Sequence, residues 1–121
     1  MRYWYDCEFL EDGRTIAPIS IGIVADDGTE YYAIDINAPW ERIADHPWLV
    51  GNVIPHLPQL PADQRTIDLD WVRLGVDLSD PAVKPLWRIA AEVREFLTRH
   101  NGPVELWGYY SSYDHILLSQ L

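Results

Sequence analysis

The sequence has little cysteine and few basic residues, and both shortages narrow what the chain can be. Cys7 is the only cysteine, so no internal disulfide can form, which indicates either a reducing, cytoplasmic setting or a buried thiol. Nine Lys and Arg residues stand against nineteen Asp and Glu, which gives a formal net charge of −10 at pH 7. We therefore expect no basic surface for sequence-blind binding of nucleic acid backbones. No apolar run is long enough for a signal segment or a membrane span, so no membrane partner is expected.

The sequence contains enough hydrophobic residues to form the core of one small domain. It has 121 residues, of which 48% are hydrophobic. Six Trp and seven Tyr are a high number for this length, and most of these rings should lie in the core or at an interface. The last apolar pattern stops at Leu121 without Gly, Pro or a basic last turn. We expect a single domain over residues 1–121 that is incomplete at its C-terminus.

The first third of the chain has the pattern of three strands. Residues 3–9, 16–24 and 30–36 are short runs rich in aromatic or β-branched side chains. The first two runs are separated by Glu11-Asp12-Gly13, and the last two by an Asp-Gly turn at Asp27-Gly28. Strands joined this closely pair with their chain neighbours, which predicts an antiparallel meander.

The segment from 37 to 80 is the hardest to interpret, because prolines interrupt every periodic pattern in it. Residues 44–56 are compatible with a short helix whose apolar side would carry Trp48, Val50 and Ile54. The rest of the segment is expected to be loop, and its role is not predicted.

A longer helix follows. Ser79-Asp80-Pro81 is a typical helix start, and Asn101-Gly102-Pro103 a typical end. The apolar residues between them recur at helical spacing and predict one buried side: Leu86, Ile89, Ala90, Val93, Phe96 and Leu97.

After this helix we expect a buried strand over residues 104–108, with Trp107 in the core, and then a second helix. A helix between two strands suits a crossover that adds a parallel strand to the sheet. The predicted class is therefore α/β.

Two acids lie close together in the first strand. Alternate side chains of a strand share a face, so Asp6 and Glu8 should project together, about 7 Å apart along the backbone. Two carboxylates within an aromatic strand are costly unless water, a cation or hydrogen bonds meet them. A magnesium ion is one solution, since it is bound through carboxylates and water. An edge strand with a solvated face explains the pair equally well.

Asp114 is the candidate for a third ligand. It lies at the start of the helix after the last predicted strand, where a side chain can lean over the end of a sheet. Taken alone, Asp114 is better explained as a first-turn acid that the helix dipole favours. The combination with a strand Asp-x-Glu, a meander and a crossover helix is more specific.

At this point the sequence resembles a known family. It is similar to the DEDD-type 3′→5′ exonucleases of the ribonuclease H-like superfamily, and within them most similar to the actinobacterial RNase AS family, the polyadenylate-specific exoribonucleases. Both ends of the chain carry the resemblance: Tyr5-Asp6-Cys7-Glu8-Phe9, Glu11-Asp12-Gly13-Arg14-Thr15-Ile16, Ile19-Ser20-Ile21-Gly22, Glu105-Leu106-Trp107 and Tyr113-Asp114-His115. The first block is the most specific.

The resemblance implies a fold, an activity and a metal site. Asp6 and Glu8 match the two acids of the family's first motif, and Asp114 matches the aspartate of the second. These residues would hold two Mg²⁺ or Mn²⁺ ions for hydrolysis at the 3′ end of single-stranded, adenylate-rich RNA. A homodimer is implied as well. No residues match the third motif, so the general-base histidine and the fourth aspartate are not assigned.

Three aromatic residues near the expected cleft are candidates for stacking on the terminal base, namely Phe9, Tyr109 and Tyr110. For each of them a place in the core is the more ordinary explanation. Two other functions stay open: a non-catalytic ribonuclease H-like interaction domain, and a different metal-dependent phosphohydrolase on the same scaffold.

Overall fold

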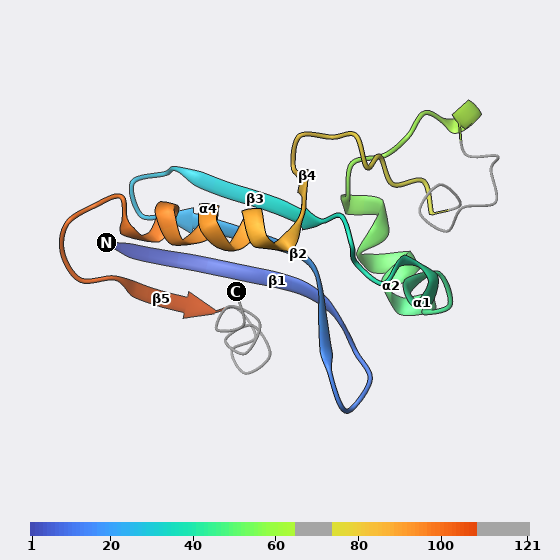
Figure 1. Ribbon diagram of the computed structural model, residues 1–121, viewed down its shortest axis with the longest axis horizontal. Helices are drawn as coiled ribbons and strands as arrows, with labels where there is room; N and C mark the ends of the chain where they lie inside the picture. Colours follow the sequence, from blue (N-terminus) through green and yellow to red (C-terminus); the bar gives the residue numbers. More distant parts are fainter. Residues whose placement is uncertain (65–73, 109–121) are drawn as a thin grey trace.

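The computed structural model describes residues 1–64 and 74–108, and a mixed sheet of five strands forms its centre (Figure 1). The strand order is β4-β3-β2-β1-β5. Strands β1 (Arg2–Glu11), β2 (Ile16–Ala25) and β3 (Glu30–Asp35) pair antiparallel in chain order. β5 (Glu105–Gly108) is parallel to β1, and β4 (Val83–Lys84) is parallel to β3. The predicted α/β class is confirmed, and the arrangement is compatible with a ribonuclease H-like fold.

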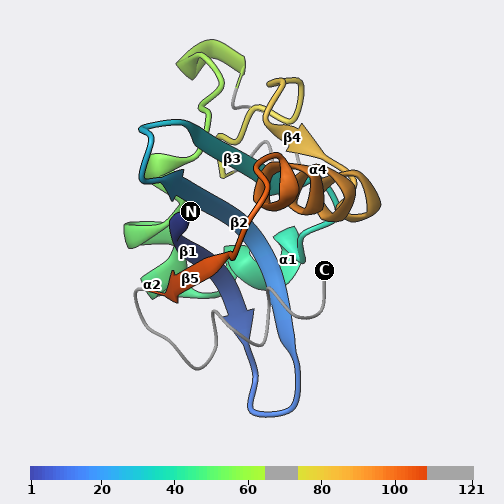
Figure 2. The same ribbon diagram turned by 90° about the vertical axis from the view of Figure 1, so that its left-hand side faces the viewer.

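Helix α4 (Leu86–Thr98) runs along one face of this sheet (Figure 2). Its predicted apolar side is confirmed, because Ile89 and Val93 are buried there, with Phe96 and Leu97 packed beside them. The sheet residues beneath α4 are Tyr3, Tyr5, Cys7, Ile21, Ile23, Ala25 and Ala33. In the described ranges, no helix is both long and apolar enough to cross a membrane.

The start of α4 was predicted wrongly. The helix begins at Leu86 with Pro85 as its N-cap, and Ser79-Asp80 lies in turns before it. Ser79 N donates to the carboxylate of Asp77 at 2.9 Å, and Ala82 N donates to the carboxylate of Asp80 at 2.9 Å. Short polar side chains that bind their own backbone in this way compete with helix formation. β4 then follows and pairs with β3 before the helix begins.

Short helices cover part of the opposite face. They are α1 (Trp40–Ala44), α2 (Pro47–Asn52) and the 3₁₀ turn η1 (Ile54–His56), with a further turn η2 at Ala62–Gln64. Their buried residues pack on the far end of β1, β2 and β3. Residues of the helices, the strands and the loops between them form one cluster there: Leu10, Ile19, Ile34, Ala38, Trp40, Ile43, Leu49, Val53, Ile54, Leu57 and Val76.

The sequence placed one short helix in this segment, with Trp48 on its apolar side. The structure has two helices there, and Leu49 is the residue of α2 that is buried, whereas Trp48 is 59% exposed. The prediction is therefore wrong for Trp48, whose place is taken by Leu49, and confirmed for Ile54, which is 3% exposed.

In the part of the chain that the structure describes, no helix covers the other half of that face. Trp4, Trp107 and Tyr32 are 45%, 52% and 42% exposed. Trp107 lies directly beside Trp4 in the parallel pairing of β5 with β1, and its neighbour Leu106 packs on the cluster under α4 instead. The prediction of Trp107 as a core residue is therefore wrong, because the described residues cover β5 on the Leu106 side only.

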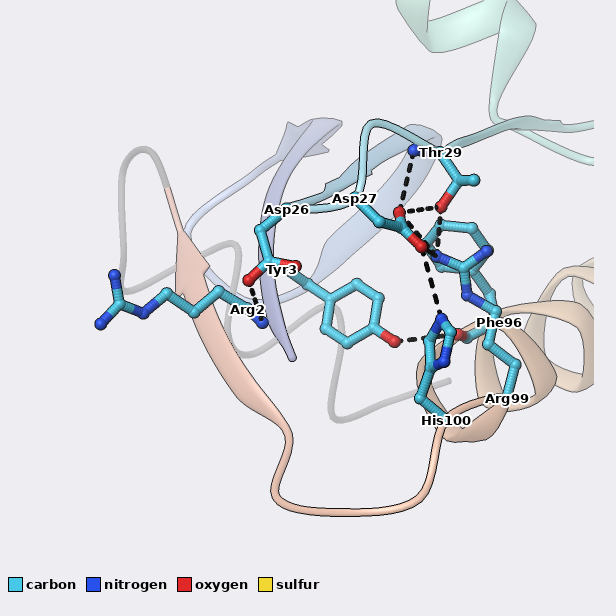
Figure 3. Close-up of polar contacts among 8 residues, drawn as sticks. All are labelled: Arg2, Tyr3, Asp26, Asp27, Thr29, Phe96, Arg99 and His100. Atoms are coloured by element: carbon cyan, nitrogen blue, oxygen red, sulfur yellow. Dashed lines mark hydrogen bonds and ion pairs between the residues drawn. The ribbon is translucent and has the colours of Figure 1, made fainter.

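The turn between β2 and β3 is bound to the end of α4 (Figure 3). The carboxylate of Asp27 accepts hydrogen bonds from Thr29 N at 3.0 Å and from the Thr29 hydroxyl at 2.6 Å. Arg99 Nη2 lies 3.2 Å from the same carboxylate and also donates to the Thr29 hydroxyl, and His100 Nε2 lies 3.4 Å away. The bonds from Thr29, helped by the charge of Arg99, hold the pKa of Asp27 well below its usual range.

This contact predicts a pH-dependent contribution to stability. A carboxylate whose pKa is depressed on folding stabilises the native state above its unfolded pKa, about 4, and loses that effect as the pH falls through the folded value. Asp27→Asn should therefore lower the melting temperature at pH 7, and the difference from wild type should shrink below about pH 4.

Thermal unfolding followed by circular dichroism at several pH values measures this effect. The matched control is Asp45→Asn at the exposed end of α1, which should change the melting temperature little at either pH. A loss for Asp27→Asn that is as large at pH 3 as at pH 7 would contradict the explanation.

Candidate functional site

The two faces of β1 have different surroundings, and this difference creates the candidate site. Tyr3, Tyr5 and Cys7 are buried under α4. Because side chains alternate along a strand, Asp6 and Glu8 project from the opposite face. Asp6 is exposed and Glu8 is half-buried. The pair therefore lies on the sheet face that α4 does not cover.

On that face the two acids lie where the helical cover ends. Beyond them Leu10 is buried beneath α1 and α2, while before them Trp4 belongs to the open half of the sheet. Asp6 is opposite Gly22 in the pairing with β2, and Glu8 is opposite Ser20. The absence of a side chain at Gly22 leaves space above the sheet beside Asp6.

The strand changes register next to the acids. Glu8 is opposite Ser20, but Phe9 is opposite Pro18, so β2 has one extra residue at Ile19. Such bulges change the direction of neighbouring side chains and recur beside active sites. Here the burial alternation of β1 breaks at this point, and Phe9 is half-buried beside Glu8.

Three hollows meet at the acids. The first, which we call the α2 cavity, measures about 370 Å³ and lies between the end of β1 and helix α2. Its lining residues are Asp6, Cys7, Glu8, Phe9, Glu11, His46, Trp48 and Leu49. β5 pairs only with residues 2–5 of β1, so its pairing ends before this cavity begins.

The second hollow, the η1 cavity, measures about 240 Å³. It separates the sheet from η1 and is lined by Asp6, Glu8, Ser20, Gly22, Tyr32, Asn52, Val53, His56 and Leu57. The third, on the open half of the sheet, measures about 520 Å³ and includes Trp4, Tyr32 and Trp107 in its lining. Asp6 borders all three hollows, and Glu8 borders two.

Tyr32 lines the η1 cavity together with Asp6 and Glu8. Burial raises the pKa of Tyr32, and the negative charge of Glu8 raises it further, against the opposing effect of a hydrogen bond with Ser20. Ser20 is itself buried. A protonated phenol beside the two acids is a hydrogen-bond donor at neutral pH.

The structure brings together three of the residues predicted from the sequence. Asp6, Glu8 and Phe9 line the α2 cavity. Asp114, Tyr109 and Tyr110 lie outside the described residues. Within residues 1–64 and 74–108, no group of three His, Cys, Asp or Glu side chains is arranged to hold a metal ion. The two carboxylates on β1 are hard oxygen donors of the kind that magnesium and manganese prefer, so they fit part of a metal site.

Sequence reasoning missed the helical wall of the site. His46, Trp48, Asn52 and His56 border the α2 and η1 cavities although they lie about 40 or more positions after the acids in the chain. His46-Pro47 does carry a local signal, because Pro in the first turn after a polar cap is a typical helix start. That signal places a helix but not its position against β1.

Magnesium in phosphoryl-transfer enzymes is usually bound through one or two carboxylates together with substrate phosphates, and the acid pair on β1 is compatible with such a site. No protein-family model matches the chain. Two curated proteins from different strains of Mycobacterium tuberculosis, each named a 3′-5′ exoribonuclease, are 39% identical to it over 127 aligned positions. The match covers 100% of this chain and 61% of each relative. The resemblance to exoribonucleases inferred from the sequence is confirmed by this similarity, which extends over all of this chain but less than two thirds of each relative.

The position of α2 depends on one buried side chain, and this can be tested. Leu49 is 3% exposed and packs in the cluster beneath α1 and α2. Leu49→Ala should lower the free energy of unfolding by about 2–5 kcal/mol, because it removes buried methyl groups and leaves a cavity. Chemical denaturation measures the change.

Gly51 supplies a control of opposite sign in the same helix. It is exposed, and a Cβ built on it would meet nothing within 4 Å. Gly51→Ala should raise the free energy of unfolding by about 0.4–1 kcal/mol by restricting the unfolded chain. If Leu49→Ala cost no more than an exposed substitution, the anchoring role of Leu49 would be wrong.

Proposed function

We propose that this chain forms the part of a metal-dependent 3′→5′ exoribonuclease that carries its first acidic motif. The observation that supports it is the placement of Asp6 and Glu8 together, where three hollows meet, in a chain 39% identical to proteins named 3′-5′ exoribonucleases. The proposed substrate is the 3′ end of single-stranded RNA, in particular an adenylate-rich end. A cytoplasmic homodimer is the proposed setting.

In this proposal Asp6, Glu8 and Asp114 hold two Mg²⁺ or Mn²⁺ ions. When bound, such a pair polarises the phosphodiester, lowers the pKa of an attacking water and stabilises the departing 3′ oxygen. The exposed carboxylate of Asp6 borders all three of the hollows described above, where a substrate phosphate could approach it. Glu8 is more buried than Asp6. Because its side chain is less exposed to water, its electrostatic interactions with nearby charges are stronger.

The other residues of the chain orient the substrate and limit the access of water. The protonated Tyr32 hydroxyl is a donor within the field of Glu8, where it can support the carboxylate or a substrate oxygen. α2 and η1 close the far side of the η1 cavity. Phe9 lines the α2 cavity, and with Tyr109 and Tyr110 it is proposed to contact the bases.

A second candidate function has one observation in its favour. Trp4, Tyr32, Trp107 and Val24 are large apolar side chains exposed on one half of the sheet face. Contiguous exposed apolar surface is typical of an interaction site, which would fit a non-catalytic domain. Hydrolysis of RNA by the whole protein excludes this alternative. Cleavage of a phosphate monoester in preference to an oligoadenylate would identify the third candidate, another phosphohydrolase.

The metal-site proposal predicts the effect of neutralising the acids. Asp6→Asn and Glu8→Gln in the whole protein should each weaken Mn²⁺ binding and reduce hydrolysis of a 5′-labelled oligoadenylate by about 100-fold or more. Even the loss of groups that only support metal ligands costs about 10- to 100-fold in affinity or activity. Calorimetric titration with Mn²⁺ and gel analysis of the products measure the two effects.

Glu95→Gln is the matched control, since Glu95 is an exposed acid on α4, on the other side of the sheet. It should leave Mn²⁺ affinity and hydrolysis at the wild-type level. Unchanged Mn²⁺ affinity and activity in both Asp6→Asn and Glu8→Gln would refute the proposed site.

A further inference from the structure

Strand β2 presents two small residues on the sheet face that carries the acids. Ser20 lies opposite Glu8, and Gly22 lies opposite Asp6. In the next pairing, Tyr32 of β3 lies opposite Gly22. Asp6, Gly22 and Tyr32 therefore form one row across three neighbouring strands.

The ring of Tyr32 lies beside the space above Gly22. A Cβ built on Gly22 would meet Cδ1 of Tyr32 at 3.8 Å, which is ordinary van der Waals contact, so a side chain longer than that of alanine would compete with the ring. Tyr32 also lines the η1 cavity together with both acids. The tyrosine side chain thus leans from β3 over β2, on the side of the cavity that the acids line.

The hydroxyl of Tyr32 has a defined hydrogen-bond partner in Ser20. This bond lowers the pKa of Tyr32, as expected when the Ser20 hydroxyl donates to the phenol oxygen. Ser20 is buried, so its hydroxyl is sheltered from water. Because the phenol oxygen accepts from Ser20, the phenol's own proton is directed to a different acceptor.

Two carboxylates are candidates for that acceptor. The negative charges of Glu8 and Asp80 both raise the pKa of Tyr32, and the effect of Glu8 is the larger. The carboxylate of Asp80 already accepts from Ala82 N at 2.9 Å. The described residues that line the η1 cavity include Glu8 and Tyr32 but not Asp80. Glu8 is therefore the better acceptor for the Tyr32 proton.

We propose that Tyr32 is a positioning residue for Glu8, whose carboxylate it holds through a hydrogen bond from its hydroxyl. Ser20 orients that hydroxyl, and Gly22 leaves room for the ring. The inference rests on the proposed exoribonuclease function, in which Glu8 is a metal ligand. Hydrogen bonds to a metal-binding carboxylate fix its orientation and so raise the affinity for the metal.

The test uses the whole protein and separates metal binding from RNA binding. Mn²⁺ affinity is measured by calorimetry without RNA, and kcat and KM for a 5′-labelled oligoadenylate are measured over a range of Mn²⁺ concentrations. The variants are Tyr32→Phe, Ser20→Ala and the double variant. The matched control is Tyr31→Phe, because Tyr31 is the next residue on the opposite face of β3, and its hydroxyl donates to Glu92 at 2.9 Å.

Tyr32→Phe should weaken Mn²⁺ binding by about 10-fold, the lower end of the range for groups that support a metal ligand. At saturating Mn²⁺ its kcat should recover and its KM for RNA should match the wild type, because the hydroxyl acts through Glu8. Ser20→Ala should weaken Mn²⁺ binding less, and should add nothing to Tyr32→Phe, since it acts through the phenol. Tyr31→Phe should lower the melting temperature and keep the wild-type Mn²⁺ affinity.

Two results would overturn the inference while leaving the exoribonuclease proposal in place. One is wild-type Mn²⁺ affinity of Tyr32→Phe in a protein that degrades RNA. The other is a raised KM for RNA at saturating Mn²⁺, which would show that the hydroxyl contacts the substrate and not Glu8. Equal losses from Ser20→Ala with and without Tyr32→Phe would refute the role of Ser20. A wild-type protein that binds Mn²⁺ but leaves oligoadenylate intact would refute the exoribonuclease proposal, and the Mn²⁺ affinities of the variants would still decide the role of Tyr32.

Discussion

The alternation of β1 is the constraint on which the rest of the structure depends. Tyr3, Tyr5 and Cys7 are buried beneath α4, and their burial leaves only one face for the side chains between them. A shift of β1 by one residue would bury Asp6 and Glu8 under the helix and expose two tyrosines. The hydrophobic packing of α4 therefore determines where the acids lie, although neither acid takes part in it.

The sheet face opposite α4 is only partly covered by the short helices, and this makes the two acids accessible as a candidate site. The cluster around Leu10, Ile34 and Leu49 covers the far end of the sheet, and within residues 1–64 and 74–108 nothing packs over the half around Trp4 and Trp107. Asp6 and Glu8 lie at the boundary between the two halves. They are enclosed enough to border cavities, and open enough for a substrate to reach them.

The negative charge of the chain would repel its proposed RNA substrate, and the residues at this boundary offer a way to overcome that repulsion. A net charge of −10 opposes the approach of RNA, and the acids of the α2 cavity add to that effect locally. In the proposed function, bound divalent cations reverse the local sign, and aromatic rings contact bases without meeting the phosphates. Affinity would then come from the 3′ end of the strand, which suits an enzyme that acts at an end.

Local patterns in the sequence determined which elements form and which side chains share a face. The shared face of Asp6 and Glu8 and the apolar side of α4 follow from repeats of two and of 3.6 residues, and both agree with the structure. Tertiary packing determined which side chains are exposed and which lie near the acids, because the repeats carry no information on either. Trp107 is exposed because the described residues cover β5 on one face only, and Trp48 lines a cavity with the acids because Leu49 anchors α2 against the sheet. The exposure of a side chain and its distance from the acids depend on residues far away in the chain. They therefore follow from the packing of α4 on one face of the sheet and of the short helices on part of the other.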